Sequence, residues 1–171
     1  MKPFNNVIVS AAEPKNNADV WIKHCKNMFK TLPNTQTVNG ITFTNNGDGT
    51  ITVNGTATAV AYITIDKRNL QSKKYALSGC PVGGGQNKYS IYMSDTGAWS
   101  NIAQDFGNGA NFNLDSLKNI ETRLRVAAGV TVNNLVFKPQ LEIGEQTKFT
   151  PYFVDDILIK EGNSYRSIFD N

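Results

Sequence analysis

The sequence has little of the chemistry that catalytic and metal sites most often use. Among its 171 residues there are two cysteines, Cys25 and Cys80, and a single histidine, His24. Two cysteines outside a C-x-x-C pair are too few for a disulfide framework or a zinc site, so two reduced structural thiols are the simpler interpretation, although the spacing alone allows a bridge. His24 and Cys25 are adjacent, and adjacent residues of a strand point to opposite faces, so we do not expect a base–nucleophile pair.

Long apolar runs and clustered charge are also missing. No segment approaches the roughly 20 apolar residues of a membrane span, and the apolar part of residues 1–10 is too short for a secretion signal. We therefore expect synthesis in a cytoplasm and no membrane partner. The net charge is +3, and the 17 basic residues are scattered rather than interleaved with aromatics. This pattern does not favour a nucleic-acid partner.

Acidic residues are present, but they form no recognisable catalytic or metal-binding pattern. No two of them have a spacing that obviously converges, and no EF-hand-type Asp-x-Asp-x-Asp-Gly loop occurs. We therefore expect no enzymatic activity, no metal site and no cofactor. A hydrolase with two carboxylates facing each other across a cleft is left open, since separation in space cannot be derived from the sequence of a β protein. The acidic residues considered are Asp95, Asp105, Asp115, Glu121 and Glu142.

Alternating apolar and polar residues dominate, whereas helical apolar stripes are nearly absent. Residues 41–43 and 51–53 alternate on either side of the turn sequence Asn46-Gly-Asp-Gly49, which favours a tight hairpin. Only residues 114–120 have helical spacing, enough for a short helix at most. The pattern predicts strands at residues 40–45, 50–54, 57–65, 73–78, 88–93, 110–114, 122–127 and 130–138.

These strands predict an all-β fold, an antiparallel β-sandwich of jelly-roll type, over residues 36–152. Residues 1–35 form an N-terminal arm or attachment segment, and residues 153–171 form a C-terminal strand and tail. Both extensions are too small for cores of their own, so their apolar residues Val7, Val9, Trp21, Ile157 and Ile159 are expected to contact other subunits. The expected core of the sandwich is Ile41, Phe43, Ile51, Val53, Ile63, Leu77, Val126 and Val136.

Four phrases in this chain occur in the order typical of one protein family. They are DVWIKHCKNMF at residues 19–29, TVNGITFTNNGDGTITVNGTA at 37–57, YALSGCP at 75–81, and VFKPQLEIG at 136–144 followed by FTPY at 149–152. Together they resemble the carbohydrate-binding-module-like jelly-roll domain of phage and prophage tail, baseplate or fibre proteins. The chain departs from the usual opening phrase by carrying Cys25 where glycine is normal, and it is shorter than a full receptor-binding fibre.

The resemblance implies a structural protein of a phage virion, in the tail, a fibre or a head appendage, made in the cytoplasm of a host bacterium. Its implied partners are a host-surface carbohydrate, other virion proteins and further copies of itself, with a trimer favoured because phage fibres commonly form trimers. An alternative is a purely architectural protein that decorates or attaches within the virion without binding glycan. A glycan-cleaving depolymerase is a third class.

A sugar site needs aromatic faces and planar polar groups, and residues 89–99 supply both. Trp99 is in a Gly-Ala-Trp-Ser-Asn turn that is hard to bury, so it is the leading stacking residue, although the ring can equally fold over the sandwich edge. Tyr92 and Asp95 are its candidate partners. Arg123 and Arg125 share one strand face and can hydrogen-bond sugar hydroxyls, or simply pair with acidic residues of an adjacent strand.

Overall fold

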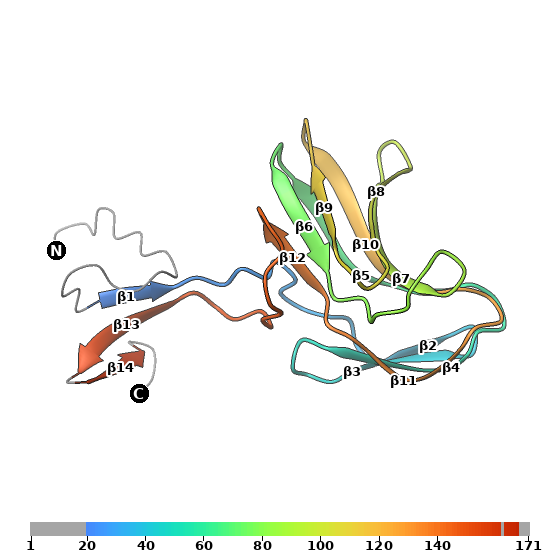
Figure 1. Cartoon of the computed structure of the whole chain (residues 1–171), viewed down its shortest axis with the longest axis horizontal. Coiled ribbons are helices and arrows are strands. Elements are labelled where there is room, and N and C mark those ends of the chain that lie inside the picture. The colour runs from blue at the N-terminus through green and yellow to red at the C-terminus, as the bar shows by residue number, and fades with distance from the viewer. Residues whose placement is uncertain (1–19, 162, 168–171) are drawn as a thin grey trace. The chain divides into compact units, whose positions relative to one another are not determined.

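The computed structural model describes residues 20–161 and 163–167 (Figure 1). In these residues it contains fourteen β-strands and no helix, so the predicted all-β class is confirmed. It follows that no helix of the described part is long and apolar enough to cross a membrane. The chain divides into a larger unit, Lys26–Tyr152, and a smaller one that combines the residues up to Cys25 with those from Phe153 onward.

The larger unit contains three antiparallel sheets. The first has the order β11-β4-β3-β2, the second β5-β10-β7-β8 and the third β12-β6-β9. The strands are β2 (Gln36–Val38), β3 (Ile41–Asn45), β4 (Ile51–Thr56), β5 (Ala61–Leu70), β6 (Lys74–Ser78), β7 (Tyr89–Asp95), β8 (Ser100–Asp105), β9 (Ala110–Asn113), β10 (Lys118–Val126), β11 (Thr131–Phe137) and β12 (Gln140–Ile143).

The β3–β4 hairpin forms where the sequence predicts it. Gly47 and Gly49 have φ angles of 78° and 84°, which glycine adopts without strain. Oδ1 of Asp48 accepts a hydrogen bond of 3.0 Å from the backbone N–H of Thr50 and so closes the turn. The register then places Phe43 opposite Val53, and both side chains are at most 1% exposed. The turn chemistry and the two-residue period therefore agree in fixing the register.

One hydrophobic cluster joins the three sheets. It includes Phe43 and Val53 of the first sheet, Ile91 of the second, and Leu77 and Leu141 of the third. Seven of the eight predicted core residues are buried, at 3% exposure or less: Ile41, Phe43, Ile51, Val53, Ile63, Leu77 and Val126.

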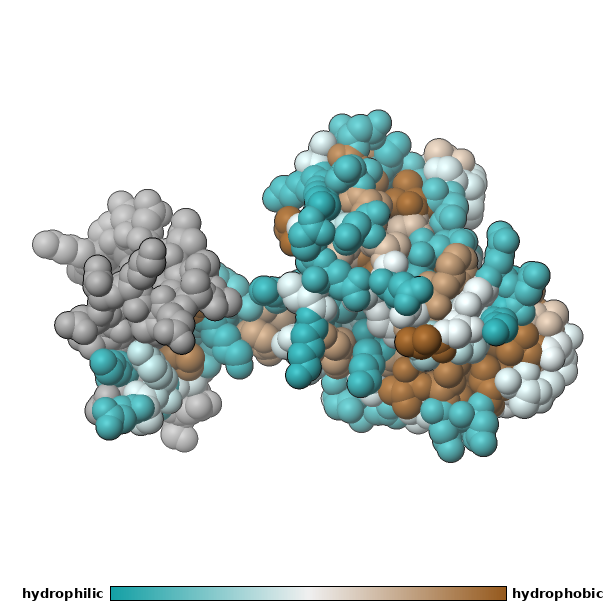
Figure 2. Space-filling model, viewed as in Figure 1, coloured by the Kyte–Doolittle hydropathy of each residue, from teal (hydrophilic) through white to brown (hydrophobic). Residues whose placement is uncertain are grey.

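Val136 is the exception, because its side chain is 39% exposed and Phe137 is buried in its place. The cause is an irregularity in the pairing of β11 with β4 between Val132 and Leu135, where Asn134 has a φ of +48°. Such an irregularity changes which residues of a strand face the core. Figure 2 shows apolar surface over the sheet that contains β4 and β11.

Residues 114–120, whose spacing allowed a short helix at most, form no helix. Leu114 and Ile120 are buried, but Leu117 is 55% exposed, and β10 already begins at Lys118. The strands β2, β8 and β12 were not predicted, because none of them alternates apolar and polar residues over enough positions to give a signal.

The smaller unit is a three-stranded antiparallel sheet of order β1-β13-β14, formed by β1 (Val20–Lys23), β13 (Asp156–Glu161) and β14 (Ser164–Ser167). β1 pairs with β13 so that Ile22 lies opposite Ile157. None of its described apolar side chains is fully buried. The predicted contacts of Val7 and Val9 lie outside the described residues.

The division into units differs from the predicted boundary at its N-terminal side. The body begins at Lys26 rather than at residue 36, because Phe29 is 3% exposed and belongs to the core cluster. Asn27 adds a polar anchor, since its Nδ2 donates a hydrogen bond of 3.0 Å to the carbonyl oxygen of Pro139. The body ends at Tyr152, the last residue of the predicted domain.

Candidate functional site

One face of the sheet β5-β10-β7-β8 carries polar and aromatic side chains. Successive side chains of a strand point to opposite faces, and Ile63, Ile91 and Leu124 point into the core at 3% exposure or less. Their sequence neighbours therefore project from the other side, which we call the open face. Directly opposed residues of antiparallel strands share a face. The register places Tyr62, Arg125 and Ser90 in one row across the open face, and Thr64, Arg123, Tyr92 and Gln104 in the next.

Arg123 is the centre of the second row. Its Nη1 donates a hydrogen bond of 2.8 Å to the hydroxyl of Tyr92, and its Nη2 donates one of 2.5 Å to Oε2 of Glu121. Its guanidinium carbon lies 4.7 Å from the ring centroid of Tyr62 and 5.8 Å from that of Tyr92, within the range of cation–π attraction. One guanidinium thus holds two aromatic rings in place on the open face.

Glu121 neutralises Arg123. Burial opposes ionisation of the Glu121 carboxyl, but a hydrogen bond of 2.6 Å from Thr64, the bond from Arg123, and the charges of Arg123 and Lys67 outweigh it and lower the pKa of Glu121. Burial likewise disfavours the charged form of Arg123, but its contacts with Tyr92 and Glu121 raise its pKa overall. The Arg123–Glu121 pair is therefore ionised at neutral pH. The sequence left open that Arg123 pairs with an acidic residue of an adjacent strand. It does form an ion pair, but its partner Glu121 is on the same strand.

Arg125 has a different environment, beside a hollow of about 250 Å³ that we call the face hollow. Its Nη1 donates a hydrogen bond of 2.7 Å to the carbonyl oxygen of Gln86, and no carboxylate of the described chain lies within ion-pairing distance of it. The side-chain amides of Gln86 and Gln104 make no hydrogen bond to described residues. The hollow thus offers unused planar donors and acceptors. It is lined by Gln86, Ser90, Tyr92, Gln104, Phe106 and Arg125.

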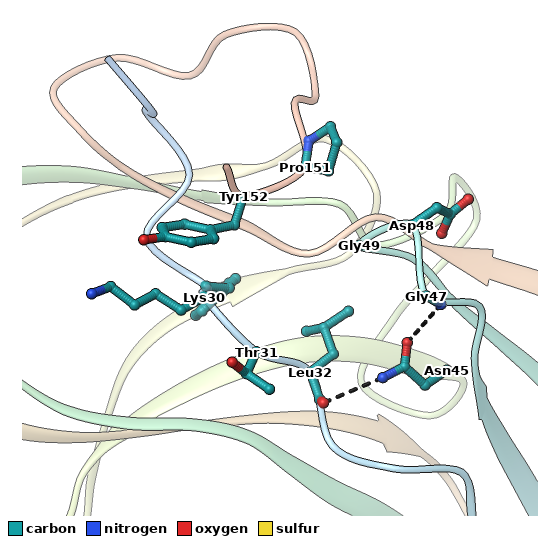
Figure 3. Close-up of a pocket in the computed structure, with 10 residues that line it drawn as sticks. Lys30, Thr31, Leu32, Asn45, Gly47, Asp48, Gly49, Pro151 and Tyr152 are labelled. Carbon is teal, nitrogen blue, oxygen red and sulfur yellow. Dashed lines mark hydrogen bonds between the residues drawn. The ribbon is translucent and has the colours of Figure 1, made fainter. Parts of the chain in front are cut away.

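A second hollow, of about 460 Å³, lies between two loops and the β3–β4 turn, and we call it the loop hollow (Figure 3). One of its polar side chains, Asn45, serves the fold. Nδ2 of Asn45 donates a hydrogen bond of 3.3 Å to the carbonyl oxygen of Leu32, and its Oδ1 accepts one of 2.9 Å from the N–H of Gly47. Lys30 Nζ lies 5.8 Å from the ring centroid of Tyr152. The loop hollow is larger than the face hollow, and the Lys30 amine, the Thr31 hydroxyl and the Tyr152 hydroxyl make no hydrogen bond to described residues. The face hollow differs from it by its planar amide and guanidinium groups.

Asp95 is not brought together with Tyr92. It pairs in register with the buried Ile120, so its side chain projects from the core side of the sheet, and it is 5% exposed. Oδ1 of Asp95 accepts a hydrogen bond of 2.8 Å from the N–H of Gly97, and Oδ2 lies 3.6 Å from Nζ of Lys118. Asp95 therefore stabilises the β7–β8 turn. The odd spacing between positions 92 and 95 was the sequence signal for opposite faces.

Trp99 lies in the β7–β8 turn with its side chain 79% exposed, so it does not pack over the edge of the sheet. Its φ of +52° is in the left-handed region, which a bulky residue seldom occupies. Tyr92 and Asp95 are three residues apart on an extended strand, which is roughly 10 Å. Trp99 comes after Asp95, in the turn, and therefore lies beyond the face hollow. Of the five predicted site residues, the structure gathers Tyr92, Arg123 and Arg125 on one face, places Trp99 at the adjoining turn and turns Asp95 away.

Several residues of the open face were not predicted from the sequence. Tyr62 precedes the buried Ile63, so alternation alone could have placed it there. Gln104 and Phe106 belong to or follow β8, which was not predicted. Gln86 is in the loop after the glycine triplet at 83–85, and no sequence signal pointed to it.

The other buried carboxylates have structural partners. Asp105 accepts hydrogen bonds of 2.7 Å from the N–H groups of Cys80, Gly107 and Gly109. Glu142 accepts one of 2.6 Å from the hydroxyl of Thr147. Within residues 20–161 and 163–167, no three His, Cys, Asp or Glu side chains gather as a metal site would require.

The two cysteines are not joined by a disulfide. Cys80 is buried, and burial together with the charge of Asp105 raises the pKa of its thiol to about 12. Sγ of Cys25 accepts a hydrogen bond of 3.3 Å from the N–H of Phe153, and His24 Nδ1 lies 2.9 Å from Oδ2 of Asp155. His24 and Cys25 follow β1 rather than lying in it, and each contacts residues 153–155.

No protein-family model matches the chain, and neither the curated proteins nor the solved structures compared with it gave a significant match.

Proposed function

We propose that this chain is a structural protein of a phage virion whose larger unit, a β-sandwich of jelly-roll type, binds a host-surface glycan on the open face. The observation that carries the proposal is the combination found at the face hollow: the rings of Tyr92 and Phe106 beside the planar polar groups of Arg125, Gln86 and Gln104. A sugar ring has an apolar face that stacks on aromatics and a rim of hydroxyls that needs such donors and acceptors.

Rigidity of the face supports the proposal. Arg123 fixes the Tyr92 ring through a hydrogen bond and a cation–π contact, so the ring loses little freedom when a ligand binds. Trp99 extends the surface, since a glycan chain that runs along β7 from the face hollow reaches the turn at which the indole is exposed. An exposed aromatic with a left-handed backbone favours a binding role over a packing one.

The assignment to a virion rests on the four phrases that resemble phage tail and baseplate modules. The smaller unit supports contacts with other virion proteins or further copies of the chain, because none of its apolar side chains that the structure describes is fully buried. A trimer is the stoichiometry that we propose. Light scattering of the purified chain tests it, and a monomer at high concentration contradicts it.

The glycan site is tested by a glycan array followed by calorimetric titration of the best ligand into wild type and variants. Gln104→Ala removes an amide that makes no described hydrogen bond, so the fold is expected to be unaffected. Losing one or two ligand hydrogen bonds, each about 0.5–1.5 kcal/mol, weakens binding by roughly threefold to a hundredfold.

The matched control is Asn69→Ala, which removes an exposed amide of the same sheet outside the face hollow. It is expected to bind like wild type. A chain that binds no glycan on the array and in solution would contradict the proposal and favour the architectural alternative. Equal losses in the Gln104 and Asn69 variants would remove the face hollow as the site.

A further inference from the structure

The three arginines of the larger unit differ in how their charge is balanced. Arg68 donates two hydrogen bonds to the carboxylate of Asp66, at 2.5 Å and 2.8 Å, and Arg123 pairs with Glu121. Arg125 is half-buried beside the face hollow and has only the carbonyl oxygen of Gln86 as a described partner. A partly desolvated cation without a counter-charge is unfavourable unless an anion reaches it.

We propose that the glycan bound at the face hollow is anionic and that Arg125 binds its charged group. This inference rests on the proposed function and specifies its ligand. The carboxylate of a uronic acid and the phosphate of a sugar-phosphate chain share the chemistry required, because each presents paired oxygens to the fork of a guanidinium. Nη1 of Arg125 is held by Gln86, so Nη2 and Nε are the donors left for the ligand.

The charge of the whole open face supports the same ligand class. The cross-strand register places Lys67, Arg123 and Arg125 on this face, against the single carboxylate of Glu121. Glu121 has Arg123 at 2.5 Å and Lys67 at 3.5 Å, so it is already compensated. The surplus of two positive charges attracts an acidic glycan over a neutral one of the same shape.

The neighbours of Arg125 are suited to the rest of such a sugar. Ser90 lies directly opposite Arg125 in the register, and Tyr92 and Gln104 follow in the next row. A ring whose anionic group binds Arg125 can place hydroxyls near the Gln104 amide and an apolar face near Tyr92. The anion therefore sets the orientation, and the other groups select the sugar.

The test titrates three probes into the full chain: a galacturonic acid oligosaccharide, the same oligosaccharide with its carboxyl groups reduced to alcohols, and a glycerol-phosphate oligomer. At least one anionic probe is expected to bind about tenfold or more tightly than the reduced sugar, and the tighter of the two identifies the source of the charge. Arg125→Gln should abolish this preference, and Arg125→Lys should restore it only in part because it keeps the charge without the fork.

The matched control is Lys30→Gln, which removes one positive charge at the loop hollow and should leave the preference unchanged. Equal binding of the anionic and reduced probes overturns the inference while the proposed function stands. A preference that persists in Arg125→Gln, or that is lost in Lys30→Gln, also overturns it. Failure of every probe and of every arrayed glycan instead contradicts the proposed function itself. Comparing the probes on wild type needs no variant, so the inference is tested even where Arg125→Gln does not fold.

Discussion

Replacing Arg123 with methionine removes the guanidinium that organises the open face. Glu121 is only 4% exposed. After the substitution its carboxylate keeps two partners, the hydroxyl of Thr64 at 2.6 Å and the largely exposed Lys67 at 3.5 Å. Breaking a buried ion pair by removing one partner costs about 3–5 kcal/mol, and these two remaining partners reduce that cost. We expect Arg123→Met to lower the free energy of unfolding by about 2–4 kcal/mol, with a fall in Tm of roughly 10 °C.

Urea denaturation followed by far-UV circular dichroism measures the change, and a double-mutant cycle identifies its source. If the unpaired carboxylate causes the loss, adding Glu121→Gln to Arg123→Met recovers a large part of it, because the neutral amide tolerates the site. A double variant whose loss equals the sum of the single losses would refute this reasoning, as would a loss below about 1 kcal/mol for Arg123→Met.

The pH dependence gives an independent check with a defined sign. The pKa of Glu121 is lowered in the folded protein, so its stabilising contribution is present above the unfolded pKa of about 4.3 and is lost as the pH falls through the folded value. Burial raises the pKa of Glu121 and Arg123 lowers it, so the pKa of Glu121 rises in Arg123→Met. The variant's deficit is therefore expected to be largest near pH 7 and to shrink below about pH 4, where Glu121 protonates. A deficit that is equal at both pH values contradicts the electrostatic account.

The other predictions concern the exposed turn, the core and the buried thiol. Trp99→Ala should leave Tm nearly unchanged because the ring is 79% exposed, but weaken glycan binding about tenfold, whereas a large fall in Tm would show that the ring packs. Trp99→Gly should stabilise the fold by about 1 kcal/mol by relieving the left-handed backbone, and no gain in denaturation would argue against strain there. Leu124→Ala should cost about 2–5 kcal/mol and Val136→Ala less than about 1 kcal/mol, since Leu124 is 0% and Val136 39% exposed; similar losses would contradict the assigned register. Cys80 should react with a thiol reagent at pH 8 only as fast as the chain unfolds. Peptide mapping separates it from the less buried Cys25, and rapid labelling of Cys80 in the folded protein would contradict its burial and a thiol pKa near 12.

Period-two alternation predicted the all-β class and most of the core, because a strand that buries one face shows it directly in the sequence. The prediction failed at Val136, where an irregular pairing near Asn134 changed which residues face inward. It also failed for β8, whose sequence Ser-Asn-Ile-Ala-Gln-Asp alternates too weakly. Pairing irregularities and edge strands depend on contacts between distant segments, which local patterns do not encode.

The site was predicted in part for the same reason. Arg123 and Arg125 alternate with Leu124 and Val126, so their shared face could be derived, and Tyr92 lies on that face by register. Gln86 reaches the face hollow from a loop, and such an approach has no sequence signature. From the sequence, Glu121 was considered only as a possible catalytic acid. In the structure it is the counter-charge of Arg123, which lies two residues away on the same face of the strand.

Residue-resolved NMR titration shows where on the larger unit a glycan binds. A ¹⁵N-labelled chain is titrated with the tightest glycan found, and backbone and side-chain amide shifts are followed. We expect the largest changes at Gln86, Tyr92, Gln104 and Arg125, including the side-chain amides of both glutamines. Changes that gather instead around Lys30, Asp48 and Tyr152 at the loop hollow, or no changes at all at saturating glycan, would contradict binding on the open face.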